Sequence, residues 1–253
     1  MENKIKQGST HTFPLPPKNN NKPSFKKWIK YIWTGLAAVV LGIAFLFFAI
    51  SQGFLGDMPE VQELENPDIY VASEIISSDG VQLGKFEKEK TIPITYKDLP
   101  QHLIYALQAK EDERFREHSG IDMKSIARAI RYGGARGGGS TITQQLAKLL
   151  FTGNASQNKI QRAFQKLKEW VVAVSLEKRY TKEEIVTLYF NKFDFLHNAN
   201  GIELASKIYF NKSAKDLNLS EAATFVAMLE NPRRNNPIRY MDRAIKRRNV
   251  VLD

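Results

Sequence analysis

The order of apolar and polar positions along the chain predicts one long apolar helix, a short β-hairpin and then a series of amphipathic helices. Residues 31–50, YIWTGLAAVVLGIAFLFFAI, contain no charged side chain. A helix of that length rises roughly 30 Å, the hydrocarbon thickness of a bilayer. Short β-prone runs flank Asp79-Gly80, a typical hairpin turn. From Leu99 onward apolar residues recur mostly at helical spacing, so the predicted fold class is mainly α.

The apolar run at residues 31–50 has three interpretations. A cleaved signal peptide would have a shorter apolar core, of about 7–15 residues, and residues 49–51 (AIS) make a poor small-x-small cleavage site. A buried core helix does not explain the cluster of Trp28, Tyr31 and Trp33 at one end, which is typical of a membrane interface. The run is therefore predicted to be a transmembrane helix.

The distribution of charge predicts the orientation of that helix. Residues 1–30 hold seven lysines against a single acidic residue, and residues 51–84 hold neither Lys nor Arg. By the positive-inside rule the N-terminus is cytoplasmic, the protein is single-pass in the cytoplasmic (inner) membrane, and everything after residue 50 is extracytoplasmic. The basic tail also accounts for part of the net charge of +10, so no nucleic-acid partner is predicted. The absence of cysteine excludes disulfides and thiolate metal sites.

A glycine-rich loop precedes a predicted helix start at residues 133–151, GGARGGGSTITQQLAKLLF. It is not a nucleotide-binding P-loop, because Ser140 follows Gly139 with no lysine between and residues 123–132 have helical spacing where a strand is required. Thr141 is the predicted N-cap, with Gln144 as its capping-box partner. Exposed amides at such an end attract anions. A flexible turn that only starts a helix stays an equal alternative on this evidence.

Two further segments carry candidate acidic groups. Residues 110–122, KEDERFREHSGID, gather carboxylates around one histidine, and Phe115 could make the surroundings dry enough to raise a carboxyl pKa. One histidine among carboxylates is a weak metal signal, so no metal ligand is predicted. Residues 158–180 predict an amphipathic helix with Glu169 opposite its apolar stripe. Glu169 is either a surface partner of Lys166 or a carboxylate that lines a cleft. Paired carboxylates are the usual equipment for chemistry at a glycosidic bond.

Several stretches, in order, resemble the signature motifs of the peptidoglycan glycosyltransferases. They are Glu111-Asp112-x-x-Phe115-x-x-His118-x-Gly120, GGGSTITQQLAK at 137–148, KxxE at Lys166–Glu169, YTKEEIVTLYFN at 180–191 and GIELASKIYF at 201–210. These enzymes polymerise lipid II, alone or as the N-terminal domain of class A penicillin-binding proteins. Residues 236–252, NPIRYMDRAIKRRNVVL, resemble the segment that leads into the transpeptidase domain of the bifunctional kind.

The resemblance implies a lysozyme-like glycosyltransferase domain that transfers glycan in one inverting step. The donor is the growing strand on a polyprenyl diphosphate, and the acceptor is the 4-hydroxyl of the GlcNAc of another lipid II. Glu111 would be the general base, and Glu169 would help to stabilise the leaving diphosphate. No cofactor is certain, although a divalent cation such as Mg²⁺ is attributed to such sites. Lipid II, the growing strand, the membrane and other cell-wall synthesis proteins are the expected partners. The expected substrate-binding residues are Asp112, Arg128, Ser140, Gln144, Gln145, Lys148 and Lys166.

The chain departs from the family pattern at a few positions. Gln165 stands where an arginine is usual, Lys110 where a small residue or Thr is common, and Leu196 where a glycine is expected nearby. Arg162 lies nearly one turn from Gln165 and could supply the missing charge. Two other functions stay open. A lysozyme-like muramidase or lytic transglycosylase would need neither the basic residues nor the membrane helix, and a catalytically weakened glycan-binding scaffold is the non-enzymatic alternative.

The predicted domain organisation follows from the pattern and the resemblance together. It comprises a basic, disordered cytoplasmic tail (1–30), the transmembrane helix (31–50), a stalk (51–69), a β-hairpin region (70–98), the glycosyltransferase domain (99–240), and the start of a linker to a transpeptidase domain beyond this sequence (241–253).

Overall fold

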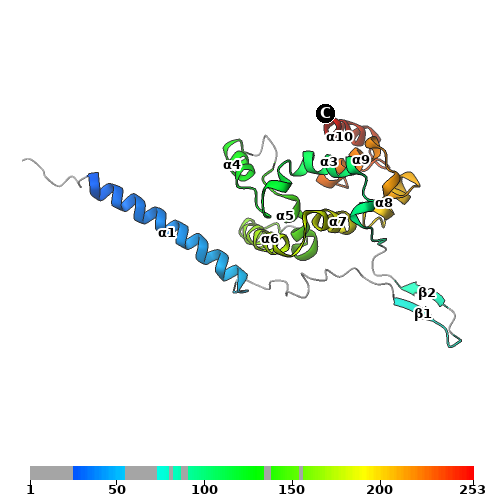
Figure 1. Ribbon diagram of the computed structural model, residues 1–253, viewed down its shortest axis with the longest axis horizontal. Helices are drawn as coiled ribbons and strands as arrows, with labels where there is room; N and C mark the ends of the chain where they lie inside the picture. Colours follow the sequence, from blue (N-terminus) through cyan, green and yellow to red (C-terminus); the bar gives the residue numbers. More distant parts are fainter. Residues whose placement is uncertain (1–24, 55–72, 80–81, 87–90, 134–137, 154–155) are drawn as a thin grey trace, which may run out of the picture. The chain divides into compact units, whose positions relative to one another are not determined.

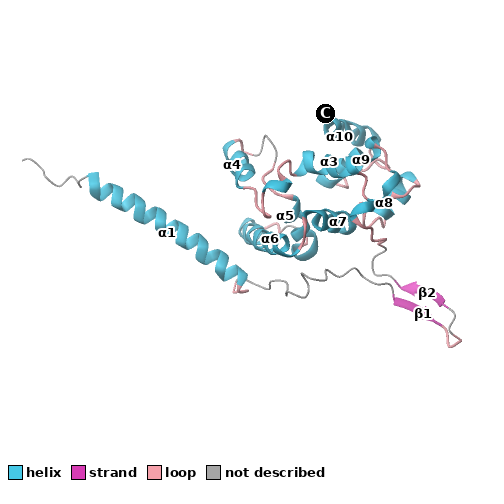
Figure 2. Cartoon of the chain, in the orientation of Figure 1, coloured by secondary structure: helices cyan, strands magenta, loops and turns pink. Residues whose placement is uncertain are grey.

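The computed structural model describes residues 25–54, 73–79, 82–86, 91–133, 138–153 and 156–253 (Figures 1 and 2). The chain divides into two compact units, residues 1–46 and 47–253. Residues 1–24 of the predicted tail and most of the predicted stalk lie outside the described residues, as do Gly134 to Gly137 of the glycine-rich loop. The last six residues of the predicted tail, 25–30, are not disordered, because they form the first turns of the long apolar helix.

The apolar segment forms a single uninterrupted helix, α1 (Phe25–Ser51). Its stretch Lys27–Ile50 is long and apolar enough to cross a membrane, and it is the only such helix among the described residues. Thr34 donates its hydroxyl to the carbonyl of Lys30 at 2.9 Å, so its side chain needs no partner outside the helix, as a spanning segment requires. The predicted helix at residues 31–50 is therefore confirmed.

Two short strands follow, β1 (Ser73–Ile76) and β2 (Gln82–Phe86). They pair antiparallel, with Ser73 opposite Phe86. Of the predicted turn Asp79-Gly80, Asp79 is described and Gly80 lies outside the described residues.

Most of the described remainder of the chain is helical, with loops between the helices (Figure 2). They are η1 (Tyr96–Asp98), α3 (Gln101–Glu111), η2 (Phe115–Glu117), α4 (Met123–Arg131), α5 (Ile142–Ala147), the π-helical turn η3 (Lys148–Thr152), α6 (Lys159–Arg179), α7 (Lys182–Lys192), α8 (Ile202–Phe210), η4 (Ala214–Asp216), α9 (Leu219–Glu230) and α10 (Met241–Leu252).

The short helix α5 lies at the centre of this unit and packs against both α6 and α7, while α3 packs against α9 and α9 against α10 (Figure 1). Leu107, Leu146, Phe190 and Phe225 are fully buried where these helices meet. Because α10 also packs against α3, residues 241–252 share the packing of the helical unit. That a linker to a further domain starts there stays a prediction.

Local sequence signals explain where key helices begin. Thr181 and Glu184 form a capping box at the start of α7. Thr141 is the N-cap of α5 as predicted, since its side chain accepts from the backbone N–H of Gln144. The second half of that predicted box is wrong. The Gln144 amide donates instead to the carbonyl of Gly120, at 3.2 Å, so it connects α5 to the loop that contains Gly120, whereas the box would have closed on the start of α5 itself.

Candidate active site

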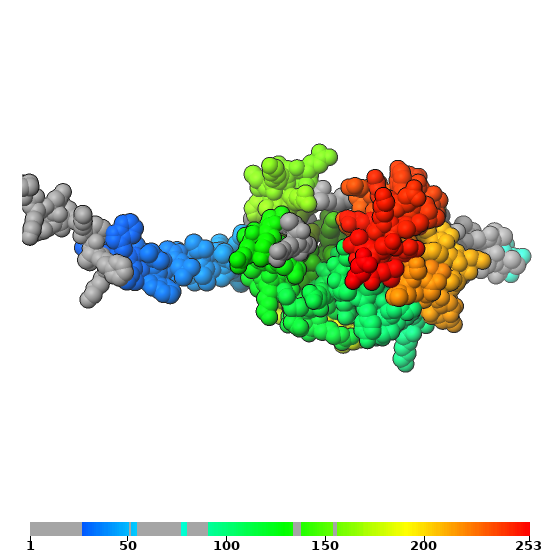
Figure 3. Space-filling view, turned by 90° about the horizontal axis from the view of Figure 1, so that it is seen from above, coloured from blue at the N-terminus to red at the C-terminus, as the bar shows by residue number. Residues whose placement is uncertain are grey.

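A cavity of about 720 Å³ runs between α6 on one side and α3, α5, α7 and α9 on the other. Figure 3 shows a recess between the yellow-green beginning of α6 and the red α10. A second cavity of about 690 Å³ adjoins it, lined by residues that include Lys110, Arg128 and Arg247. Glu111, Ser140, Gln145 and Glu230 line both cavities. Glu111 therefore stands where the two cavities meet.

Glu111 is the last residue of α3 and is held by an uncharged donor. Its Oε2 accepts a hydrogen bond from Nε2 of Gln145 at 2.7 Å. Burial raises the pKa of Glu111, and the nearby carboxylates of Glu230 and Asp112 raise it further, against the opposing effects of the Gln145 bond and the charge of Lys110. No ion pair to Glu111 occurs within the part of the chain that the structure describes. A carboxylate in such surroundings is suited to accept a proton.

Glu169 lines the first cavity from α6 in a different setting. It is only 8% exposed, and its Oε2 lies 2.8 Å from Nζ of Lys166. The same ammonium group donates to Oγ of Ser140 at 2.9 Å, which ties α6 to the end of the glycine-rich loop. The pair with Lys166 is real, but the burial of Glu169 excludes the interpretation as an exposed surface pair. The cleft-lining interpretation is the correct one.

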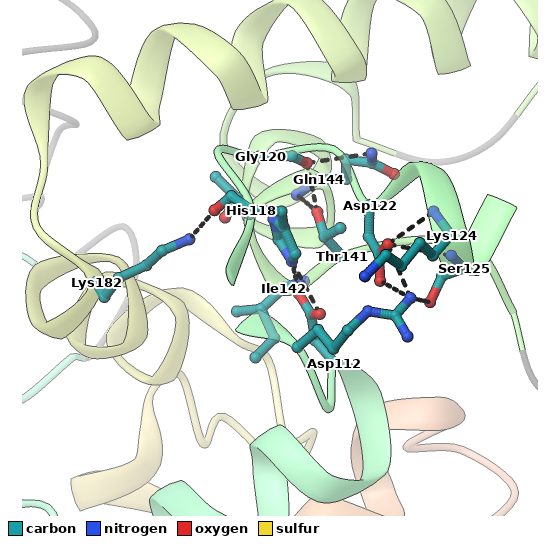
Figure 4. A network of polar contacts seen from close by, with 12 residues as sticks. Asp112, His118, Gly120, Asp122, Lys124, Ser125, Thr141, Ile142, Gln144 and Lys182 are labelled. Atoms are coloured by element: carbon teal, nitrogen blue, oxygen red, sulfur yellow. Dashed lines mark hydrogen bonds and ion pairs between the residues drawn. The ribbon is translucent and has the colours of Figure 1, made fainter. Parts of the chain in front are cut away.

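The loop that follows Glu111 is fastened to α5 by Asp112 (Figure 4). The Asp112 carboxylate accepts from Nε2 of His118 at 3.0 Å and from the backbone N–H of Ile142 at 3.0 Å. Asp112 is 7% exposed. Both of its oxygens are engaged by the protein itself, Oδ1 by His118 and Oδ2 by Ile142, so the geometry favours a positioning role over the predicted contact with substrate.

Gly120 makes the next connection in this network (Figure 4). Its carbonyl accepts from the Thr141 hydroxyl at 2.7 Å and from the Gln144 amide at 3.2 Å. Its φ is +88°, and a Cβ there would lie 2.9 Å from the backbone of Ala173 in α6. Only glycine permits that conformation together with so close an approach. The loop, α5 and α6 are thereby locked together beneath the first cavity.

All the predicted site residues lie around the two joined cavities. Those of the first are Glu111, Ser140, Gln144, Gln145, Lys148, Lys166 and Glu169. Asp112 and Arg128 line the second. Gln144 is fully buried, so it forms part of the wall beneath the cavity surface.

Sequence reasoning missed several residues that line these cavities. Tyr189 of α7 and Glu230 of α9 line the first one, and Arg247 of α10 lines the second. Lys159 was also missed, although its spacing of three from Arg162 and seven from Lys166 puts it on the same face of α6. That spacing was the available signal. No such sequence signal existed for Tyr189, Glu230 and Arg247, because the patterns of their helices indicate only packing.

The charge of the first cavity is positive around Glu169. Lys148, Lys159, Arg162 and Lys166 all line it. Gln165 also reaches the cavity, but its Oε1 accepts from the backbone N–H of Ser156 at 2.8 Å. Gln165 is neutral where the family pattern has an arginine. Lys159 and Arg162 supply positive charge to the same cavity.

The described residues hold no cluster of three or more His, Asp or Glu side chains that could bind a metal ion. The only histidine of the first motif, His118, already donates to Asp112. Magnesium prefers six oxygen ligands and often takes several from substrate phosphates. The described side chains therefore do not make a magnesium site by themselves.

Comparison with known proteins agrees with this geometry. The sequence model of the family described as "Transglycosylase" matches residues 79–253. Penicillin-binding protein 1A of Pseudomonas aeruginosa is 34% identical over 89% of this chain and 27% of its own length. Penicillin-binding protein 1A of Escherichia coli is 34% identical over 89% of this chain and 26% of its own length. Penicillin-binding protein 1F of Bacillus subtilis is 37% identical over 73% of this chain and 26% of its own length. The chain spans about a quarter of the length of these curated relatives, and it belongs to the transglycosylase family.

Proposed function

We propose that this chain is a membrane-anchored peptidoglycan glycosyltransferase, which polymerises lipid II into glycan strands in cell-wall synthesis. The observation that carries the proposal is the position of Glu111 at the junction of two cavities. A transferase must hold a donor and an acceptor on either side of its base. One cavity offers Glu169 and several cations for a diphosphate, and the other leaves room for the second sugar. Membership of the transglycosylase family and relatives named penicillin-binding proteins support the same reaction.

The reaction is a single displacement at the anomeric carbon of the donor. Glu111 takes the proton from the acceptor 4-hydroxyl, and the oxygen attacks that carbon from the face opposite the diphosphate. The bond from carbon to the diphosphate oxygen breaks, and its electron pair leaves with the polyprenyl diphosphate. The configuration at the carbon is thereby inverted. The raised pKa of Glu111 favours this proton transfer.

The cations of the first cavity stabilise the charge that develops on the leaving group. Lys148, Lys159, Arg162 and Lys166 converge on one cavity, and charge-assisted hydrogen bonds to phosphate are among the strongest that proteins make. Glu169 holds Lys166 at 2.8 Å and thereby fixes the direction of its ammonium group. Ser140 accepts from the same group, so the glycine-rich loop takes part in binding the diphosphate.

The helix α1 anchors the enzyme in the membrane that carries its substrate. A single span with a lysine-rich N-terminal flank is oriented with that flank in the cytoplasm, which leaves the catalytic unit outside. The polyprenyl chains of donor and acceptor lie in the same membrane. Lipid II and the growing strand are therefore the partners of the site, and other cell-wall synthesis proteins are further expected partners.

The test is incubation of the purified full chain, in vesicles, with lipid II labelled on the sugar. A glycosyltransferase yields long labelled strands and free polyprenyl diphosphate. A muramidase or lytic transglycosylase yields no strands but shortens preformed ones, and a glycan-binding scaffold retains both substrates unchanged. Strand synthesis that requires Glu111 would support the proposal, and cleavage without synthesis would replace it with the hydrolytic alternative.

A further inference from the structure

Behind Glu111 lies a buried phenol that the proposed reaction does not use. Tyr189 of α7 is fully buried, and its hydroxyl donates to Oε1 of Gln145 at 2.9 Å. The other end of the same amide, Nε2, donates to Oε2 of Glu111 at 2.7 Å. Three side chains from three helices thus form one directed chain of hydrogen bonds that ends on the carboxylate.

The direction of this chain depends on the phenol. A glutamine amide presents a donor at one end and an acceptor at the other, and half a turn exchanges the two. With the oxygen turned towards Glu111, an ionised carboxylate would face another acceptor and be repelled. A phenolic hydrogen aimed at Oε1 favours the orientation in which the N–H groups face Glu111. The phenol also keeps its hydrogen, because burial and the charge of Glu111 raise the pKa of Tyr189 well above its usual value.

We infer that Tyr189 is a positioning residue for the transfer reaction: its hydroxyl fixes the Gln145 amide, and the amide holds the Glu111 carboxylate in the orientation in which it receives the acceptor's proton. The inference rests on the proposed role of Glu111 as the base. It assigns Tyr189 no contact with substrate. Its effect passes through Gln145 alone.

The experiment compares the wild-type chain with Tyr189→Phe, which removes the hydroxyl and keeps the ring in the core. Without the hydroxyl the amide turns more freely, so N–H donation to the ionised carboxylate is reduced and the protonated form gains. The pKa of Glu111 rises, and the acid limb of the rate profile for strand synthesis moves to higher pH. We expect a shift of about half a unit and a fall in kcat of about tenfold, with KM changed by less than about twofold.

The charged groups that face Glu111 from neighbouring elements stay the same in this comparison. They are Lys110 and Asp112 beside it, Glu230 with its partner Arg247 on α9 and α10, and the pair of Lys166 and Glu169 on α6. Since none of them is altered, a moved acid limb reports on the Tyr189 hydroxyl.

The matched control is Tyr209→Phe. The hydroxyl of Tyr209 is likewise hydrogen-bonded, to the carbonyl of Phe195 at 2.6 Å and from the amide of Asn236 at 2.9 Å, but Tyr209 lines neither cavity. This variant should lose stability without moving the acid limb. A double-mutant cycle with Gln145→Met completes the test. In the Gln145→Met background, Tyr189→Phe should cost no further activity, whereas an independent structural role would give additive losses.

Direct titration of Glu111 separates this inference from the proposed function. Carbon-13 labelling of glutamate carboxyls, with Glu111→Gln to assign the resonance, gives the pKa of Glu111 in chains with or without activity. An upward shift in Tyr189→Phe supports the inference even if the wild-type chain makes no strands, a result that would refute only the proposed function. An unchanged pKa overturns the inference. Should Tyr189→Phe not fold, Gln145→Met keeps the inference open to refutation: it removes the donor to Glu111, and an unchanged pKa of Glu111 in that variant would overturn the inference.

Discussion

The two sides of the first cavity hold their carboxylates in opposite ways. On the Glu111 wall, formed by Glu111, Gln145 and Tyr189, hydrogen bonds from uncharged donors connect α3, α5 and α7. On the Glu169 wall, formed by Lys159, Arg162, Lys166 and Glu169 of α6, the carboxylate is neutralised by an ammonium group at 2.8 Å. One acidic group is thus left without a cation, while the other is surrounded by them.

This difference shows how one residue type can serve two tasks in a single site. A carboxylate without a paired cation, kept from water, tends to take up a proton. A carboxylate paired with a lysine, as Glu169 is with Lys166, holds that lysine in place. Local environments that give two carboxylic acids different tendencies to hold a proton are a recurring basis for acid–base chemistry. The comparison predicts that substitutions on the Glu111 wall change the proton transfer, and substitutions on the Glu169 wall change the handling of the diphosphate.

The largest expected effect comes from Glu111→Gln. The amide keeps the shape and can still accept from Gln145, but it cannot take a proton. Strand synthesis should fall by about 10²–10⁴-fold in kcat, with donor affinity close to that of the wild type. Because the folded protein raises the pKa of Glu111, its ionised form disfavours folding at neutral pH. The neutral variant should therefore be at least as stable as the wild type in thermal unfolding.

The control for this substitution is Glu117→Gln, which changes an exposed carboxyl in η2 that lines neither cavity. It should retain full activity. Strand synthesis by Glu111→Gln at the wild-type rate would contradict the assignment of the base and remove the difference between the two walls.

Lys166→Met should have the next largest effect, on the Glu169 wall. It removes one cation from the cavity, breaks the link to Ser140 and leaves Glu169 buried without its partner. We expect kcat/KM for lipid II to fall by about 10–100-fold. The free energy of unfolding should fall by only about 1 kcal/mol, since Lys166 is partly exposed and its charge is screened. The control is Lys178→Met, an exposed lysine at the far end of α6. Equal losses in both variants would show that the effect arises from the helix and that the cavity is not its source.

The contrast between the walls also shows how much the sequence could predict. The helical spacing of residues 158–180 predicted α6, and the structure confirms that helix. The spacing left a surface pair with Lys166 and a cleft-lining carboxylate both open for Glu169, and it put the apolar stripe on the opposite side. The buried face of α6 instead holds Glu169, Val172, Ala173 and Leu176, because α6 packs against α5 and borders the cavity. Thr141 was identified as the N-cap of α5 by its side-chain chemistry alone.

The remainder depended on packing that no local pattern contains. Asp112 follows Glu111 directly and was assigned to substrate, yet its carboxylate is used by Ile142, thirty residues further on. Tyr189 has the pattern of an ordinary core residue, and only the packing of α7 against α5 brings its hydroxyl to Gln145. A helical period gives the face on which a residue lies, but it does not give the polar group that the face will meet.

Lys148→Ala should produce a smaller change that depends on salt. Lys148 is exposed at the edge of the first cavity, so its attraction for a diphosphate passes partly through water. The KM for lipid II should rise about fivefold at low ionic strength and about twofold near 0.5 M salt, where the Debye length is only a few ångströms. The control Lys97→Ala removes an exposed lysine away from both cavities and should change neither value. A loss that is independent of salt would indicate that Lys148 acts through packing.

The smallest expected effect is the one that separates the walls most sharply, namely the position of the acid limb of the rate profile. The base works as the carboxylate, so the rate falls as the pH falls through the pKa of Glu111, at a midpoint above the 4.5 of an unperturbed glutamate.

Glu230→Gln removes a charge that raises this pKa and frees Arg247, so the limb should move to lower pH by about half a unit. Glu169→Gln frees Lys166, and the limb should move in the same direction by less than about 0.3 unit, because that cation is partly exposed to solvent and screened. The plateau rate is compared separately, because Glu169→Gln is expected to lower that rate by weakening the stabilisation of the leaving diphosphate. A larger shift from Glu169→Gln than from Glu230→Gln would contradict the assignment of Glu111 as the group that sets the acid limb, and the roles given to the two walls would then be wrong.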